Sequence, residues 1–332
     1  MADIAHRLTD QTLDELEDKV RKAYEQASKE AQAKTNKYFS RFKVKDAKKQ
    51  AEVQAGLITE SEYKRWRHGQ MCVGKRWQEL TLNLTQDYHN ANLIARHMIG
   101  EDMLDVYALN HNWAGYEIEH ATGIDLSWTL YNRRAVENLI RDNPKLLPDP
   151  SPKKAQEIAE NKDLQWNYDH IQNALTQGVL QGEPIPDIAN RLTQVTNMDI
   201  SSAIRNARTM MTCAENKARQ DAYDDLKERG VVLREKWIST LDSRTRHSHQ
   251  LLHGTYKDPE TGEYDNGLQY PGDPDGDPEE VYNCRCCEIA EVDHIEIETP
   301  KYSPKMKGMS FDEWLNWRGS PDQVEWYRKK YG

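Results

Sequence analysis

The sequence predicts a mainly α-helical protein with a small C-terminal α+β module and a long N-terminal helical arm. Apolar residues recur every three or four positions through most of the first two thirds of the chain, which is the spacing of amphipathic helices. A period of two replaces this spacing at Val231, Leu233 and Glu235, and a stretch dense in turn residues follows. At 332 residues the chain is also longer than most single cores, so we expect about two domains.

The N-terminal region begins with an amphipathic helix whose opposite face is almost wholly charged, so this helix needs a partner surface. Its apolar face carries Leu13, Leu16, Val20, Tyr24, Ala27 and Ala31. A second long helix is predicted from Thr59, which has capping-box spacing with Glu62, as far as Gly100. Gly69 and Gly74 are expected to bend it, since a glycine inside a helix costs about 1 kcal/mol relative to alanine.

Further helical patterns cover residues 102–119, 131–141 and 163–181, and a long helix ends at Gly230 as its C-cap. The proline-rich stretch from Asn143 to Pro152 is the clearest linker, because proline cannot continue a helix. We therefore divide the chain into a helical arm (1–142), a helical connecting region (143–230), the α+β module (231–298) and a C-terminal tail (299–332).

The composition is that of a subunit of something larger. With 30% charged and 37% hydrophobic residues and a mean hydropathy of −0.94, the chain is too polar for a single compact enzyme core of this length. The aromatic residues are 9 Trp and 16 Tyr against 3 Phe, and the first two types suit protein interfaces.

Membrane and secretory signals are not found in the sequence. It contains no run of about 18 apolar residues, and its first residues lack the basic flank and apolar core of a signal peptide. We expect a protein that is made in a cytoplasm and has no membrane partner. In that reducing compartment, the clustered Cys284, Cys286 and Cys287 favour free thiols or metal ligation over disulfides.

The net charge of −10 argues against a dedicated nucleic-acid coat, yet one stretch is basic. Its candidate DNA-contacting residues are Lys37, Arg41, Lys43, Lys45, Lys48 and Lys49, preceded by Lys34. Because Tyr38, Phe39 and Phe42 lie between them, the stretch could touch phosphates and stack on bases of non-specifically bound DNA. The alternative is a solvated helix face.

One run of uncommon residues carries the main functional signal. His249 and His253 stand four apart, on one face of a helix that Asp242 or Ser243 would cap. With Cys284 and Cys286 from a following strand they form a candidate four-ligand zinc site, in which His247 or Cys287 could replace either partner. The alternative is a small polar core in which the histidines bind backbone groups and the cysteines are small buried hydrophobes.

As an ordered series, this run closely resembles the head-morphogenesis domain of the phage Mu F-like minor head proteins. The resemblance is strong over the last third of the chain and general over the helices before it. The positions that match the family motif are Asp242, Arg244, Thr245, His249, Gly254, Pro271, Gly272, Asn283, Cys284 and Cys286, and Trp237 and Arg246 lie in the same run. His253 is a less certain member of the pattern, so the resemblance favours a cluster of His249, Cys284 and Cys286.

The sequence allows three enzyme alternatives. The tripeptide Ile238-Ser239-Thr240 followed by Glu296-Ile297-Glu298 is similar to elements of ADP-ribosyltransferases. A metal nuclease could use His249 and Asn283, but four ligands would close the coordination sphere that a catalytic zinc keeps open. A cysteine nucleophile is disfavoured because the acidic neighbours Glu279, Glu280 and Glu288 would raise the pKa of a thiol. We therefore expect no enzyme activity.

The resemblance implies a minor capsid protein of a tailed bacteriophage. Such a protein would enter the procapsid in a few copies, contact the portal protein, and meet scaffold and major capsid proteins. It would assist head assembly, DNA packaging or genome delivery, and in the virion it would lie in the capsid interior near the portal. The alternative is a metal-dependent or ADP-ribosylating enzyme fused to a helical adaptor.

Overall fold

The structure is a computed structural model that describes residues 3–150 and 162–332. It divides into two compact units, each assembled from separate stretches of the chain. Unit 1 contains residues 1–16, 99–150 and 205–332, and unit 2 contains residues 17–98 and 151–204. One junction, between Pro150 and Ser151, falls within the predicted linker, whose last two residues lie outside the described part. The division of the chain into four consecutive regions stays a prediction.

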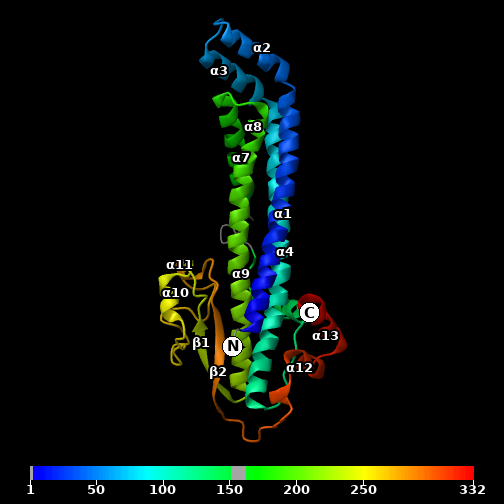
Figure 1. Ribbon diagram of the computed structural model, residues 1–332, viewed down its shortest axis with the longest axis vertical. Coiled ribbons are helices and arrows are strands. Elements are labelled where there is room, and N and C mark those ends of the chain that lie inside the picture. The colour runs from blue at the N-terminus through cyan, green and yellow to red at the C-terminus, as the bar shows by residue number, and fades with distance from the viewer. Residues whose placement is uncertain (1–2, 151–161) are drawn as a thin grey trace. The chain divides into compact units, whose positions relative to one another are not determined.

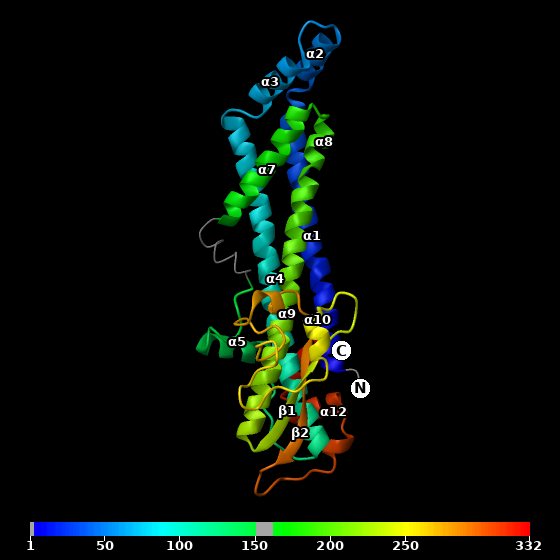
Figure 2. The ribbon, with the colours of Figure 1, turned by 90° about the vertical axis from the view of Figure 1, so that its left-hand side faces the viewer.

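The predicted fold class is confirmed, since long helices dominate and the described strands form one two-stranded sheet (Figures 1 and 2). The helices are α1 (Ile4–Ser40), α2 (Lys43–Gln54), α3 (Glu60–Met71), α4 (Lys75–Thr122), α5 (Arg133–Asp142), α7 (Lys162–Gln181), α8 (Ile185–Asn190), α9 (Leu192–Glu228), α10 (His247–Leu252), α11 (Pro278–Val281), α12 (Phe311–Arg318) and α13 (Pro321–Tyr331), with a 3-10 turn η1 (Met306–Gly308). The strands are β1 (Val231–Ile238) and β2 (Cys287–Ile295), paired antiparallel.

Unit 2 is a helical body in which α2 and α3 follow the end of α1. The predicted capping box is confirmed at the start of α3, where Thr59 and Glu62 bind each other's backbone N–H groups. The core of the unit includes Phe39, Trp77 and Leu175. Buried Tyr38 donates its hydroxyl to the Met71 carbonyl at 2.8 Å, which ties the end of α1 to the end of α3.

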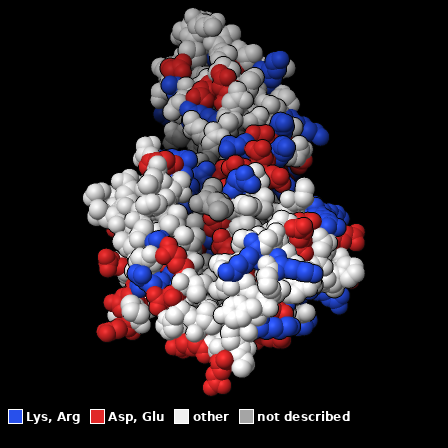
Figure 3. All heavy atoms as spheres, turned by 60° about the horizontal axis from the view of Figure 1, so that its bottom comes forward, with Lys and Arg blue, Asp and Glu red and all other residues white. Residues whose placement is uncertain are grey.

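Unit 1 joins the sheet to the helices of both chain ends. Its core contains Trp113, Trp128, Val231 and Trp314. The Trp314 indole donates to the carboxylate of Glu119 on α4 at 2.7 Å, which ties α12, in the predicted C-terminal tail, to this core. On the face that Figure 3 presents, acidic and basic side chains are interspersed among uncharged ones.

Two boundary predictions are wrong. The second long helix was expected to run to Gly100 with bends at Gly69 and Gly74. Instead it is interrupted between Met71 and Lys75, where Gly74 adopts a φ of +94°, and Gly69 lies within α3. At Gly100 there is no break, because α4 continues to Thr122. Tertiary packing along α4 outweighs the modest cost of one glycine inside a helix.

None of the described helices combines the length and the apolar character of a membrane span.

Candidate metal centre and the motif around it

The motif run forms a compact layer beside the end of β1. At that end, the N–H of Gly254 donates to the Trp237 carbonyl at 2.8 Å, and the Trp237 N–H donates to the Thr255 carbonyl at 3.0 Å. Gly254 has a φ of +82°, a conformation that costs glycine little, which accounts for glycine at this motif position. The turn folds α10 back over β1.

Three predicted ligands converge in this layer. The Nδ1 atom of His249 lies 3.5 Å from the sulfur of Cys284 and 3.5 Å from the sulfur of Cys286. All three side chains are at most 2% exposed. Zinc bonds of about 2.3 Å to sulfur and about 2.05 Å to nitrogen, at the tetrahedral angle, would separate the two ligand atoms by roughly 3.5 Å. The geometry therefore fits one zinc ion bound by these residues.

The outer nitrogen of His249 is also fixed. Its Nε2 atom lies 2.8 Å from a carboxylate oxygen of Glu280, which also accepts from the Ser248 hydroxyl at 3.1 Å. A carboxylate on the outer nitrogen of a metal-binding histidine orients the ring and raises its basicity. From the sequence, Glu280 was expected only to be an acidic neighbour of the cysteines. Nothing in its spacing from His249 marks it as a hydrogen-bond partner.

His253 lies outside the cluster. Its Nδ1 atom accepts the backbone N–H of Ser239 at 3.1 Å, and it caps α10 with a ψ of 118° that leaves the helical conformation. The expected shared helix face with His249 therefore does not form, and the structure does not bring the four-ligand set together. Among the described residues, the groups with metal-ligand geometry contain neither His253 nor His247.

The pKa values of Cys284 and Cys286 are shifted in opposite directions. The hydrogen bond from the Cys284 thiol, together with His249, lowers the pKa of Cys286 to about 4 although burial opposes this, and the same pairing raises the pKa of Cys284. The expectation that acidic neighbours raise the thiol pKa is therefore wrong for Cys286. Both sulfurs are buried, so this thiolate faces His249 rather than solvent.

Trp237 closes the cluster from the side of β1. Its fully buried ring meets the rings of His249 and Tyr264 edge-on, each with centroids 5.1 Å apart. The indole N–H donates to the Ser239 hydroxyl at 3.0 Å. The ring thus excludes water from the three donor atoms.

A polar stripe on α9 holds the segment that carries the cysteines. Its members, Thr209, Thr212, Asn216 and Arg219, recur every three or four residues and bind the main chain of Asn283, Cys284, Cys286 and Glu288. Asn216 makes two of these bonds, to the Cys286 carbonyl at 3.1 Å and from the Glu288 N–H at 2.7 Å. Sequence reasoning missed this stripe, although its helical period was a readable signal.

Asp242 clamps the loop instead of capping α10. Its carboxylate accepts two hydrogen bonds from Arg285, at 2.7 and 2.8 Å, and one from the Arg244 N–H at 2.9 Å. These bonds hold the pKa of Asp242 well below its usual range. The predicted cap is wrong, because α10 begins only at His247 and Asp242 is used earlier in the loop. Thr245 also donates to the Thr240 carbonyl, and the exposed Arg244 guanidinium lies 3.6 Å from the Asp242 carboxylate.

The remaining motif residues shape the backbone. Gly272, with a φ of +81°, has its Cα so near α9 that a Cβ would lie 3.1 Å from the Cys213 nitrogen, and Pro271 before it is buried. Asn283 adopts a φ of +59°, which Asn tolerates better than most residues. Arg246 donates to the Tyr282 carbonyl. These residues turn the chain between α10 and β2.

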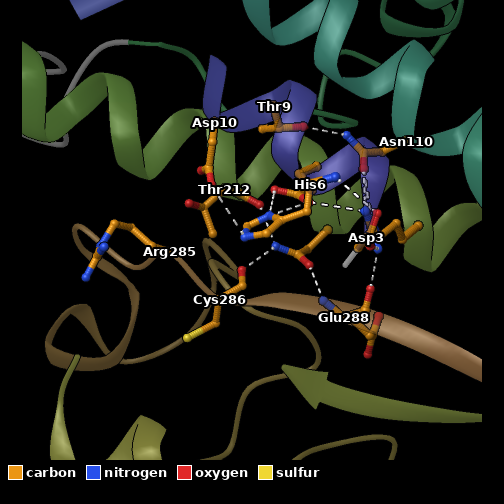
Figure 4. A network of polar contacts seen from close by, with 12 residues as sticks. Asp3, His6, Thr9, Asp10, Asn110, Thr212, Arg285, Cys286 and Glu288 are labelled. Carbon is orange, nitrogen blue, oxygen red and sulfur yellow. Dashed lines mark hydrogen bonds and ion pairs between the residues drawn. The ribbon is translucent and has the colours of Figure 1, made fainter. Parts of the chain in front are cut away.

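A buried ionic network lies behind the stripe. Arg219, fully buried, contacts the carboxylate of Asp3, donates to the Asn110 side-chain oxygen at 2.8 and 3.0 Å, and donates to the Glu288 carbonyl at 2.8 Å. Figure 4 shows Asp3, just before α1, converging with Asn110 of α4 and Glu288 of β2. The start of α1 is thereby anchored in unit 1.

His6 belongs to the same network. Burial alone lowers the pKa of His6, but the Glu215 carboxylate, 2.9 Å from Nδ1, and Cys287 outweigh this and raise it to about 12. His6, Glu215 and Cys287 have donor atoms near enough to one another for a metal. However, Glu215 also lies 3.3 Å from the Arg219 guanidinium, so the carboxylate is in an ion-paired arrangement.

The aromatic residues of the basic stretch pack in or against the core of unit 2. Tyr38 and Phe39 are buried in the core of unit 2, and Phe42 packs against that core. Tyr38 and Phe39 are therefore not available to stack on bases, and the contact of the basic stretch with DNA stays a prediction. The side chains of Lys37, Arg41, Lys43, Lys45 and Lys48 are exposed, whereas Lys49 is half-buried and pairs with Glu52 at 2.5 Å.

The structure also separates the two tripeptides of the ADP-ribosyltransferase alternative. Ser239 and Thr240 follow the last residue of β1, whereas the Glu296 N–H binds the Gly230 carbonyl just before its first residue. An eight-residue strand places these two positions roughly 25 Å apart. They cannot act on one substrate atom in this arrangement.

Part of the chain matches a known protein family. The family model described as Phage Mu protein F like protein matches residues 169–289, which include the polar stripe of α9 and all motif residues. The predicted resemblance to the phage Mu F-like family is thus confirmed over residues 169–289. The match begins 62 residues before the module boundary expected at residue 231 and therefore covers helices that the sequence resemblance described only in general terms.

Two curated proteins are similar to the chain. An NAD(+)–arginine ADP-ribosyltransferase, EFV, of Enterococcus faecalis is 30% identical over 205 residues, covering 60% of this chain. The chain spans about 40% of the length of that relative. Minor head protein GP7 of Bacillus phage SPP1 is 22% identical over 245 residues, covering 74% of this chain and 71% of its own length. No solved structure shows a significant match.

Proposed function

We propose that this chain is a minor head protein of a tailed bacteriophage, bound to the portal inside the procapsid and retained in the virion. One observation carries the proposal: the region matched by the phage Mu F-like family is the region that the α9 stripe and the buried cluster build into one layer. The similarity to minor head protein GP7 over about three quarters of the chain agrees with it.

The test is co-assembly with the neighbouring head proteins. The chain is co-expressed with the portal, scaffold and major capsid proteins of its own phage, and procapsids are purified with and without the portal. We expect a few copies per procapsid, lost when the portal is omitted. A matched control replaces the chain with an unrelated helical protein of equal size. Exclusion of the chain from portal-containing procapsids would contradict the proposal.

We propose that this role involves no catalysis. The similarity to an ADP-ribosyltransferase favours the alternative, but it covers about 40% of that protein, and the two tripeptides lie at opposite ends of β1. Incubation with labelled NAD⁺ and arginine-containing proteins tests the alternative. We expect no transfer of label, and transfer that disappears in the E296Q/E298Q variant would establish an enzyme.

We also propose that His249, Cys284 and Cys286 bind a structural zinc ion. The 3.5 Å separations, the burial of all three donors and the Glu280 partner support the proposal. When bound, the ion would link α10 to the start of β2. The protein supplies three ligands here, so four protein ligands do not close the coordination sphere as the sequence predicted. The burial of the three donor side chains is what favours a structural role for the ion.

A further inference from the structure

Charge is unevenly distributed along the chain. Residues 34–76 contain twelve Lys and Arg but only four Asp and Glu, whereas the whole chain has a net charge of −10. This segment comprises the end of α1, all of α2 and α3, and the start of α4. Unit 2 therefore has a cationic end within an acidic protein.

Contacts bring the two ends of this segment together. The rings of Tyr38 on α1 and Trp77 on α4 have centroids 6.1 Å apart. Burial raises the pKa of Tyr38 to about 12, and both Arg41 and Arg76 oppose that rise, so both guanidinium groups lie near the same ring. From the sequence, only residues of α1 and α2 were expected on this surface. The residues at the start of α4 were not.

The cations of the segment fall into two classes. Lys34, Lys49, Lys64 and Arg67 each form an ion pair, with Asp87, Glu52, Glu60 and Asp46 respectively. The other class, which we call the basic end, is exposed and has no ion pair within the described part of the chain; it consists of Lys37, Arg41, Lys43, Lys45, Lys48, Arg65, Lys75 and Arg76.

The kind of partner follows from this composition. Five of the eight residues are lysines, which are depleted at protein–protein interfaces but act as point charges towards phosphate. Tyr38, Phe39 and Trp77 are buried, so these three rings are not available for an unpaired base to stack on. Contact with a duplex through its backbone alone fits both facts.

We propose that the basic end binds the phosphate backbone of double-stranded DNA without sequence preference. This deepens the proposed function, on which it rests for the identity of that DNA as the packaged genome. Lys75 and Arg76 of α4 are assigned to the surface together with Arg41, across the contact between Tyr38 and Trp77. A second copy of the chain is the competing occupant, because residues 258–280 contain nine Asp and Glu and no Lys or Arg.

The experiment uses the full chain and a fluorescent duplex of about 30 base pairs, titrated from about 50 to 200 mM salt. The test variant is Arg41→Gln/Lys75→Gln/Arg76→Gln. The matched control is Lys22→Gln/Lys29→Gln/Lys305→Gln, which removes the same charge from exposed positions elsewhere. Thermal unfolding verifies that both variants fold, and light scattering follows self-association in the same buffers.

We expect the wild type and the control to bind the duplex with steep salt dependence. The test variant should bind on the order of 10- to 100-fold more weakly at low salt, with a slope of log affinity against log salt smaller by about three. Equal binding by the test variant and the control, or no binding by the wild type, would overturn the proposal. So would salt-sensitive self-association that the test variant loses while duplex binding is unchanged. Incorporation of the test variant into procapsids is measured in parallel. Because incorporation tests the proposed function and not DNA binding, it distinguishes failure of this proposal from failure of the proposed function.

Discussion

Asn216 fixes the main chain of β2 at Glu288, whose N–H donates to the Asn216 side-chain oxygen at 2.7 Å. The same side chain donates to the carbonyl of Cys286 at 3.1 Å, so the residues on both sides of Cys287 are held by one amide. This arrangement directs Cys286 towards His249 and leaves Cys287 in the group with His6. One buried helix residue thus lies between the candidate metal centre and the ionic network.

Replacing Asn216 with leucine should destabilise the protein by about 2–4 kcal/mol, because two buried backbone groups lose their partners. Urea unfolding measures the change. Asn197→Leu is the control, since it makes the same exchange at an exposed position of α9. Thr212→Val, which removes a single bond to the Cys284 carbonyl, should cost about half as much. Equal stability of the Asn216 and Asn197 variants would show that the stripe does not hold β2.

Purified protein should contain about one zinc ion per chain, and a chelator should lower its melting temperature, since metal binding is linked to folding. His249→Ala should abolish zinc binding, whereas His253→Ala should retain it because His253 binds the Ser239 backbone instead. Elemental analysis of the two variants measures the difference. Retention of zinc by the His249 variant, or a metal-free wild type with an unchanged melting temperature, would refute the three-ligand site.

Glu280→Gln should weaken zinc affinity by about 10- to 100-fold while leaving the ligands in place. The reason is that an amide polarises the outer nitrogen of His249 less than the carboxylate at 2.8 Å does. Competition with a zinc-binding dye gives the affinity. Glu279→Gln, at the exposed neighbouring position, should bind zinc like the wild type. If both variants bind alike, Glu280 does not support the metal site.

Stability should depend on pH through Glu288. Burial raises the pKa of this fully buried carboxyl from 4.5 to about 7, although Lys257 opposes the rise. The folded protein therefore retains a proton that the unfolded chain has lost between about pH 4.5 and pH 7. This group's contribution to stability is present below pH 4.5 and is lost as the pH rises through 7.

Glu288→Gln removes that dependence and keeps an acceptor for the Tyr264 hydroxyl, which donates to Glu288 at 2.8 Å. Relative to the wild type, the variant should gain up to about 3 kcal/mol of stability between pH 5 and pH 8. Denaturant unfolding at several pH values tests this. Glu291→Gln, at an exposed position on the same strand, should show no such gain, and a parallel pH profile for the two variants would exclude the role of Glu288.

The sequence by itself determined the features that depend on near neighbours. The period of three to four residues predicted the helices, the period of two predicted β1, and the spacing of Thr59 and Glu62 predicted a capping box, all of which the structure contains. These interactions close within a few residues, so the local pattern carries them. The ordered motif also led to the phage Mu F-like family, because motif spacing is a property of the chain.

Only the tertiary structure decided which motif side chains meet. His249 and His253 are four apart, yet α10 ends at Leu252, and a backbone N–H from β1 takes up His253. Glu280 and Asn216 gain their roles from partners 31 and 70 residues away, and Arg41 and Arg76 become neighbours only through the contact of Tyr38 with Trp77. Such contacts form where buried polar groups and rings must find partners across the core, and no local spacing encodes that choice.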